Sequence, residues 1–166
     1  LRAKKFGLID KLPGIIGAQT ASADTLYRWA ESGFIQYAPG EYKDTVASAM
    51  NINDPVSFPR VERFYGKFNI KFYRSSEPEI LKTWSRFTRA GANICPQSAV
   101  ALHAVIQAGA AGVVKEKDTV VSISNESTKK FAEVGIQQHS YEVVEGNLAA
   151  LEKKKKKDWG PFFLTD

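Results

Sequence analysis

Few residues of this chain carry side chains that commonly do chemistry, and their spacing favours structural roles. The 166 residues include one cysteine, Cys95, and two histidines, His103 and His139. A lone cysteine is most often a small buried hydrophobe, and neither histidine has a second ligand at metal-binding spacing. A Schiff-base role for Lys129 or Lys130 has no supporting motif. We therefore expect neither a metal site nor a catalytic residue in this chain.

Hydroxyl and carboxylate side chains at predicted element boundaries have helix capping as their simplest interpretation. Ser98 begins a predicted helix, and an N-cap role suits it better than a ligand role. Asp54 and Ser57 are similarly placed to cap the helix that follows them. Ser76 and Glu79 have the spacing of a capping box, which predicts that a helix starts at this point.

The charge of the chain is concentrated in one short run. The formal net charge is +5, and the run Lys153–Lys157 accounts for it, because the other residues include 18 basic and 18 acidic side chains. Nucleic-acid binding is therefore not expected except through this run, since a binding face needs basic residues spread over a surface. We expect the run to be solvated or to contact an acidic surface.

The cysteine content and the lengths of the apolar runs bear on the cellular compartment. A single cysteine cannot form an intrachain disulfide, which favours a reducing soluble compartment such as the cytosol or the matrix of a plastid or mitochondrion. No apolar run reaches the roughly 18–20 residues that a transmembrane helix needs. The chain begins at Leu1 without a methionine or a signal-peptide pattern, so we expect that further residues once preceded it.

Short apolar runs rich in β-branched residues alternate with longer stretches of helical period. This pattern predicts an α/β fold with a mostly parallel sheet and helices on its faces. The predicted strands span residues 15–20, 69–73, 92–95 and 119–123. The predicted helices span residues 24–32, 58–68, 76–91, 98–107 and 128–135. Residues 34–57 contain Pro39, Gly40 and Pro55, so we expect an irregular segment there.

The apolar stripes of these elements predict which side chains are buried. Eight are expected in a core between the helices and the sheet: Leu81, Trp84, Phe87, Leu102, Val105, Ile106, Val120 and Val121. The domain is expected to span residues 1–139, followed by a C-terminal extension over residues 140–166. The extension ends in Trp159, Phe162 and Phe163, which we expect to dock on the domain or on a partner, because exposed aromatic groups are unfavourable in water.

Three stretches, read in order, resemble the plant-like threonine synthases. The first is F-G-L-I-D-K-L-P at residues 6–13, continued by A-Q-T-A-S-A-D-T-L-Y at 18–27. The second is A-S-A-M-N-I-N-D-P-V-S at 47–57. The third is I-C-P-Q-S-A-V-A-L at 94–102, followed by T-V-V-S-I-S at 119–124. Because several motifs occur in the right order, the chain resembles the C-terminal half of these enzymes, including the C-terminal part of their large domain.

The resemblance covers about residues 6–139 and implies a fold-type-II pyridoxal-phosphate (PLP) architecture. In that architecture the cofactor lies between two α/β domains, and O-phosphohomoserine is converted to threonine and phosphate. The family's PLP-binding lysine, the asparagine beside the cofactor's 3-hydroxyl and the glycine-rich phosphate loop all precede the matching segment. This chain has no glycine-rich loop, in which backbone N–H groups can converge on an anion. We therefore expect no cofactor in this chain, and PLP only if the missing N-terminal half is present.

The resemblance also assigns site residues. It implies that Ser124 and Asn125 lie near the cofactor and that Pro96, Gln97 and Ser98 line the substrate pocket. Ser124 matches the family's S-T-A-H-G, but Asn125 stands at its threonine, and Gln97 stands at the histidine of C-P-H-T-G. Departures at two separate stretches are not expected in a working site, so we interpret this site as degenerate.

Two functions fit these observations. We favour a truncated threonine-synthase-like domain that acts as a non-catalytic structural or accessory subunit of a larger protein assembly. Glu126 supports this hypothesis, because a carboxylate near a pyridine ring would favour a protonated nitrogen, unlike the neutral contact of the family. The alternative is the C-terminal portion of an active PLP-dependent threonine synthase, a carbon–oxygen lyase. Both require other protein chains, because half of a two-domain enzyme exposes a sheet edge and apolar faces.

Overall fold

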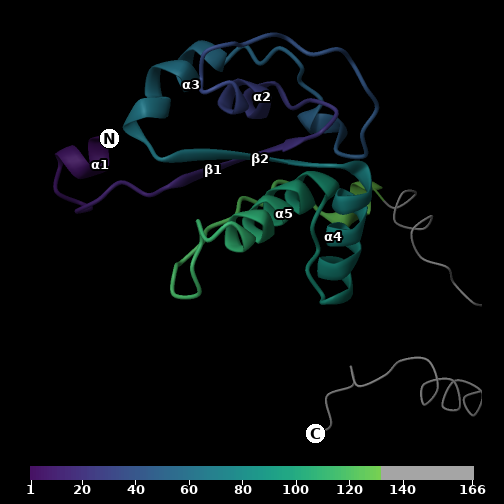
Figure 1. Cartoon of the computed structure of the whole chain (residues 1–166). Helices are drawn as coiled ribbons and strands as arrows, with labels where there is room; N and C mark the ends of the chain where they lie inside the picture. Colours follow the sequence, from purple (N-terminus) through teal and green to yellow (C-terminus); the bar gives the residue numbers. More distant parts are fainter. Residues whose placement is uncertain (132–166) are drawn as a thin grey trace, which may run out of the picture.

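The computed structural model describes residues 1–131, which form a short sheet with helices on both sides (Figure 1). The strands are β1 (Ile15–Thr20) and β2 (Ile70–Ser75). The α-helices are α1 (Arg2–Lys5), α2 (Thr25–Glu31), α3 (Phe58–Phe64), α4 (Glu77–Arg89) and α5 (Pro96–Ala110). The short 3-10 helices are η1 (Ser48–Met50), η2 (Tyr65–Lys67) and η3 (Thr128–Phe131). Helices α2 and α3 lie on one side of the sheet, and α4 and α5 lie on the other.

The two strands are parallel and pair from Ile15 opposite Ile70 to Thr20 opposite Ser75. Isoleucine, threonine and aromatic residues favour the extended conformation in both strands. Parallel neighbours need a long crossover, and residues 21–69 supply it with α2 and α3. The predicted α/β class with a parallel sheet is confirmed, although the sheet has only two strands within the described residues.

One glycine lets β1 accept an aromatic ring. Gly17 pairs with Phe72 on the neighbouring strand. A β-carbon at Gly17 would fall 2.5 Å from Cδ1 of Phe72, closer than non-bonded carbon atoms come. The absence of a side chain at Gly17 therefore permits this ring position, and both residues line an open groove on the α3 side of the sheet.

A buried acidic residue ties the first βα unit to the second strand. Asp24 directly precedes α2, and its carboxylate accepts hydrogen bonds from Nε of Arg28 at 3.0 Å and Nη1 of Arg74 at 2.6 Å. The hydrogen bond to Asp24 raises the pKa of the Arg74 guanidinium. Because a buried carboxylate is costly unless it is paired, these contacts hold α2 against β2.

The core lies between the sheet and the pair of helices α4 and α5. Its buried residues are Ala47, Ile80, Trp84, Ile94, Ala99 and Val100. The indole Nε1 of Trp84 donates to the carbonyl oxygen of Ile94 at 2.8 Å, which links α4 to the segment before α5. Burial of Trp84 is therefore confirmed. Four further predicted core residues are half-buried: Leu81, Phe87, Leu102 and Val105.

The remaining three predicted core residues are wrong. Ile106 is 42% exposed, Val120 is 40% exposed and Val121 is 86% exposed. On α5, the buried positions after Val100 are the alanines Ala104 and Ala108. Small side chains let the helix backbone approach the sheet closely, so the larger apolar residues of α5 lie at the sides of the contact.

Two predicted strands are also wrong. Residues 92–95 connect α4 to α5 without strand pairing, and residues 119–123 are likewise unpaired within the described residues. The second run has the β-branched composition of a strand, but a strand also needs a neighbouring edge. The helix predicted over 128–135 is described only as far as η3. The extension at residues 140–166, with the lysine run and the aromatic tail, lies outside the described residues.

The predicted capping box is confirmed at the start of α4. Oε2 of Glu79 accepts hydrogen bonds from the backbone N–H and from Oγ of Ser76, both at 2.7 Å. The bond from the Ser76 hydroxyl, followed by the bond from its N–H, holds the pKa of the Glu79 carboxyl below its ordinary value. Glu77, the first residue of α4, accepts a hydrogen bond from the N–H of Val46 at 2.9 Å and thereby holds the irregular segment against α4.

An aromatic cluster packs the irregular segment against α2 and α3. Trp29 contacts three rings edge-on, at centroid distances of 4.9 to 5.0 Å: Phe34, Phe58 and Tyr65. Such edge-to-face contacts stabilise buried aromatic groups beyond their apolar area. The cluster therefore fixes the path of a segment that has little regular structure of its own.

Asp54 and Ser57 were both predicted to cap the helix that follows them, and the structure gives them different positions. Ser57 takes the N-cap position of α3, but its side chain makes no capping hydrogen bond. Asp54 instead accepts a hydrogen bond at 2.9 Å from the hydroxyl of Tyr37, whose ring stacks on Phe58. Burial, together with the hydrogen bond to Asp54 and its charge, raises the pKa of Tyr37 to about 12.

Candidate cofactor-side site

The first turn of α5 forms the buried part of the candidate site. The helix begins at Pro96 with Cys95 at the N-cap position, and residues 95–100 are all buried. Proline suits this position because it has no backbone N–H and its φ already has a helical value. The prediction that Ser98 is the N-cap is therefore wrong, because Ser98 lies inside the first helical turn.

Ser98 joins this turn to the segment that carries the other predicted site residues. Its Oγ lies 3.2 Å from Sγ of Cys95 and 3.2 Å from Oγ of Ser124. The contact with Ser124 thus brings together two residues that the resemblance assigned to one site. Ser124 and the neighbouring Asn125 are exposed, whereas Pro96 is buried.

Gln97 contributes an unsatisfied amide to the site. The residue is 7% exposed, and neither Nε2 nor Oε1 of its side chain has a hydrogen-bond partner among the described residues. A buried polar group without a partner costs about 1–3 kcal/mol. Gln97 therefore opposes the stability that the apolar neighbours of this turn provide.

An ion pair follows directly after the exposed site residues. The carboxylate of Glu126 and the ammonium group of Lys130 are in contact, four residues apart. This pair connects the extended segment, residues 119–127, to η3, which carries Lys130. Lys129, the other lysine considered for a Schiff base, is exposed.

A polar row beside this turn was missed by the sequence reasoning. Nδ1 of His103 lies 2.8 Å from Oγ of Ser75, and its Nε2 lies 3.9 Å from Oε1 of Glu79. These residues belong to α5, β2 and α4, so one imidazole connects three elements. Ser75 is fully buried, which makes the row a structural link and not a nucleophilic site. Only the capping box at Glu79 was visible in the sequence.

Within residues 1–131, no group of three or more His, Cys, Asp or Glu side chains is arranged to hold a metal ion. The second histidine, His139, lies outside the described residues. The described helices also include none that combines the length and the apolar content required of a membrane span.

Parallel strands with helices on both faces define an α/β domain. A family model described as pyridoxal-phosphate dependent enzyme matches residues 2–126. The chain belongs to this family.

The relatives that it resembles are threonine synthases. Threonine synthase 2, chloroplastic, of Arabidopsis thaliana is 34% identical over 143 residues, which cover 86% of this chain and 28% of that protein. Threonine synthase of Mycobacterium tuberculosis is 30% identical over 118 residues, which cover 70% of this chain and 31% of that protein. The crystal structure of threonine synthase from Escherichia coli matches with a TM-score of 0.67 at 21% identity, covering 86% of this chain and 33% of that chain. The predicted resemblance is confirmed, and this chain spans about a third or less of each relative's length.

The residues of the candidate site match only part of a PLP molecule. Ser124 and Asn125 offer hydrogen-bonding groups that suit a ring nitrogen. A covalent PLP site also needs a lysine amine directed at the aldehyde and several donors for the phosphate. Lys130 is paired with Glu126, and Lys129 is exposed. Among the described residues, the donor set therefore does not fit a complete PLP site.

Proposed function

We propose that this chain acts as a non-catalytic structural or accessory subunit of a larger protein assembly, built on a threonine-synthase-like domain. The observation that carries the proposal is the 3.2 Å contact between the Oγ atoms of Ser98 and Ser124. It uses as a structural link two hydroxyl groups that the resemblance assigns to the substrate pocket and the cofactor. A hydroxyl already bonded within the protein must give up that bond, or share it, before it binds a ligand.

The ion pair between Glu126 and Lys130 supports the same proposal. A Schiff base requires a lysine amine that is free to attack an aldehyde. Lys130 is instead held by the carboxylate of Glu126, in the segment that precedes η3. The hydroxyl of Ser124 and the amine of Lys130 thus both take part in contacts within the chain.

Other protein chains are the partners that this proposal requires. Val121 and Ile123 in the extended segment are 86% and 76% exposed. Within the described residues, each strand also pairs on one side only. Exposed apolar residues and free strand edges are surfaces at which chains associate. We propose a reducing compartment, cytosol or organelle matrix, for the assembly; the Arabidopsis relative is described as chloroplastic.

Two measurements test the absence of catalysis. The purified chain is mixed with PLP and reduced with borohydride, and labelled peptides are quantified by mass spectrometry. We expect sparse labelling spread over many lysines, equal to that of the heat-denatured chain. Phosphate release from O-phosphohomoserine is expected to stay at the uncatalysed rate, with threonine synthase from Escherichia coli as the positive control. Stoichiometric labelling of one lysine, or release at an enzymatic rate, would contradict the proposal.

The alternative is that this chain is the C-terminal portion of an active PLP-dependent threonine synthase. The match of the PLP-dependent family model over residues 2–126 favours it. The intact mass of the native polypeptide separates the two hypotheses. A mass that exceeds that of these 166 residues by the size of a second domain would support the active enzyme.

A further inference from the structure

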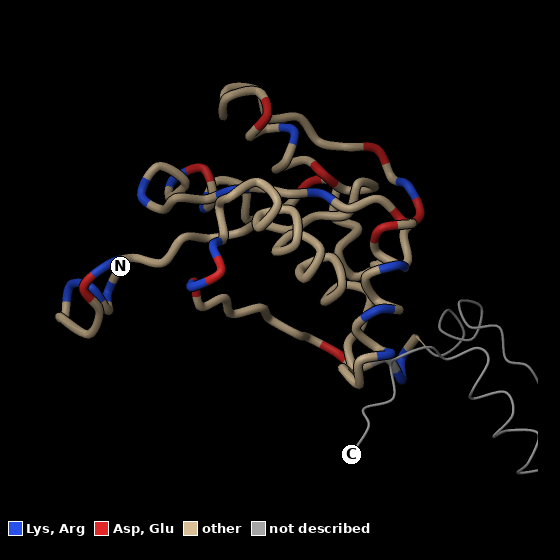
Figure 2. Tube along the Cα trace, turned by 60° about the horizontal axis from the view of Figure 1, so that its bottom comes forward, with Lys and Arg blue, Asp and Glu red and all other residues tan. Residues whose placement is uncertain are grey.

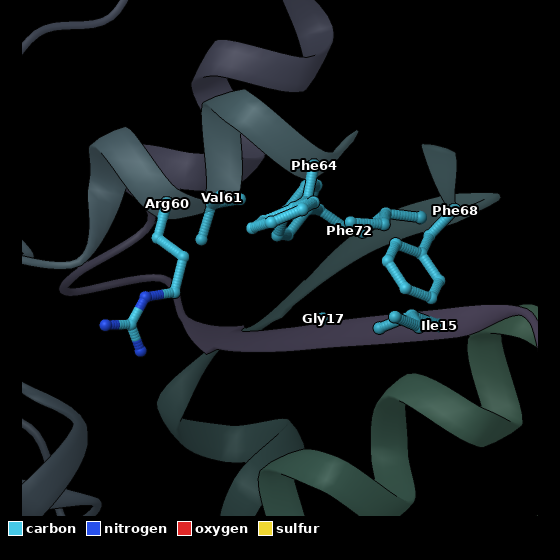
Figure 3. A pocket seen from close by; sticks show the side chains of 8 residues that line it. Ile15, Gly17, Arg60, Val61, Phe64, Phe68 and Phe72 are labelled. Carbon is cyan, nitrogen blue, oxygen red and sulfur yellow. The ribbon is translucent and has the colours of Figure 1, made fainter. Parts of the chain in front are cut away.

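An open apolar groove lies on the side of the sheet opposite α5. Its volume is about 300 Å³. Strands β1 and β2, helix α3 and the loop before β2 supply its apolar lining residues: Ile15, Val61, Phe64, Phe68, Ile70 and Phe72. Figure 3 shows the three phenylalanine side chains gathered above β1. The place of Phe72 over Gly17 leaves the ring against the strand, so aromatic carbon forms this wall of the groove.

Cations adjoin one side of this lining, at Arg60 and beside the Phe64 ring. The side chain of Arg60 lines the groove, and its guanidinium group points outward (Figure 3). Cζ of Arg63 lies 5.7 Å from the centroid of the Phe64 ring, and Nζ of Lys67 lies 5.5 Å from it. None of the three forms an ion pair within residues 1–131. Three unpaired positive charges therefore adjoin one apolar hollow.

We propose that this groove binds a free fatty acid, with the hydrocarbon chain along the phenylalanine rings and the carboxylate at Arg60, Arg63 and Lys67. Apart from Arg60, the lining residues are apolar or glycine, and such a surface disfavours a ligand whose body needs hydrogen bonds. The cations at the rim favour an anionic head, and carboxylate is a group that arginine binds well. The volume is at the lower end for small-molecule sites, which suits one acyl chain of moderate length.

The test measures dissociation constants of the full chain for hexanoate, octanoate and decanoate below their micelle concentrations. Burying each added methylene group should tighten binding by about fourfold until the groove is filled. The alcohols of equal chain length should bind at least fivefold more weakly than the acids. This series separates the apolar contribution from that of the charge.

The cationic rim is tested with the triple variant R60Q/R63Q/K67Q, whose substituted side chains are exposed, so the fold should persist. We expect it to bind acids as weakly as alcohols and to bind alcohols like the wild type. The matched control is K82Q/R86Q/R89Q, which removes three exposed cations from α4 and should change neither affinity. Figure 2 marks Lys and Arg positions in blue at several separate places along the trace. A Val61→Phe variant, with circular dichroism as the folding check, should weaken both acids and alcohols by filling the groove.

Three results would overturn the proposal. The first is the absence of saturable binding by any acid of the series. The second is equal affinity for acids and alcohols in the wild type, or equal loss in the rim variant and its α4 control. The third is binding to anionic phospholipid vesicles without binding to monomeric fatty acid, which would identify a membrane-facing surface instead.

Discussion

Gln97 illustrates how one side chain can oppose the structure that surrounds it. Its amide is buried without a partner among the described residues, and methionine has a similar volume without donors to satisfy. We expect Gln97→Met to raise the free energy of unfolding by about 1 kcal/mol. Denaturant titration of both proteins measures this difference.

The control for this prediction is Gln36→Met, which changes an exposed glutamine and should leave stability nearly unchanged. A Gln97→Met variant that is less stable than the wild type would show that the amide makes a favourable hydrogen bond in the full chain. The two variants share the same chemistry and differ only in burial.

At the level of residues, the candidate site stays a prediction, and the sequence did not indicate its geometry. The I-C-P-Q-S motif does mark a helix start, as predicted. Ser98 was assigned the N-cap because its hydroxyl is a good capping group. Pro96 decides the matter instead, because its fixed φ makes it the first helical residue and leaves Cys95 as the N-cap. Contacts across 26 residues, such as that between Ser98 and Ser124, have no local sequence signal.

The start of α4 carries a contribution to stability that depends on pH. Hydrogen bonds from Ser76 hold the folded-state pKa of Glu79 below its unfolded value, which is about 4.3. The carboxylate therefore contributes stability above that pH, and the contribution is lost as pH falls through the folded-state pKa. We expect Glu79→Gln to unfold more easily than the wild type at pH 7, with a difference that shrinks toward zero in acid.

Thermal unfolding at several pH values measures this effect. Glu62→Gln, on the exposed surface of α3, is the matched control and should show no such pH-dependent difference. A Glu79→Gln deficit that is equally large at pH 7 and pH 3 would mean that geometry, and not charge, limits this helix start.

At the level of elements, local patterns predicted helices better than strands. The capping box marked the start of α4 correctly, whereas only two of the four predicted strands, those at residues 15–20 and 69–73, correspond to observed strands. A strand depends on a neighbour that a local pattern does not identify, which is why the prediction over residues 119–123 is wrong. The face of α5 was misjudged because Ala104 and Ala108 pack by being small, whereas a hydrophobic stripe identifies large residues.

The exposed run in the extended segment has a consequence for the whole molecule. Val121 and Ile123 are 86% and 76% exposed, so they add little to the stability of the chain in isolation. We expect the double variant V121T/I123T to keep its unfolding midpoint and to self-associate less at high concentration, because apolar contact area is removed. Light scattering and sedimentation measure the association.

Val56→Thr is the control for this variant, because Val56 is 98% exposed but lies in the irregular segment far along the chain from the run. It should change neither property. A marked loss of stability in V121T/I123T would show instead that the run packs within the full chain.

Because Cys95 is buried, its reactivity can report local opening of the structure around it. The sulfur is fully covered, at the junction between the core and the start of α5, and the chain has no other thiol. An alkylating reagent can reach it only when this junction opens, so the rate of alkylation reports the local opening equilibrium without any introduced label. A partner that binds over the junction would lower the alkylation rate of Cys95. A lower rate would therefore detect assembly through a residue of the core.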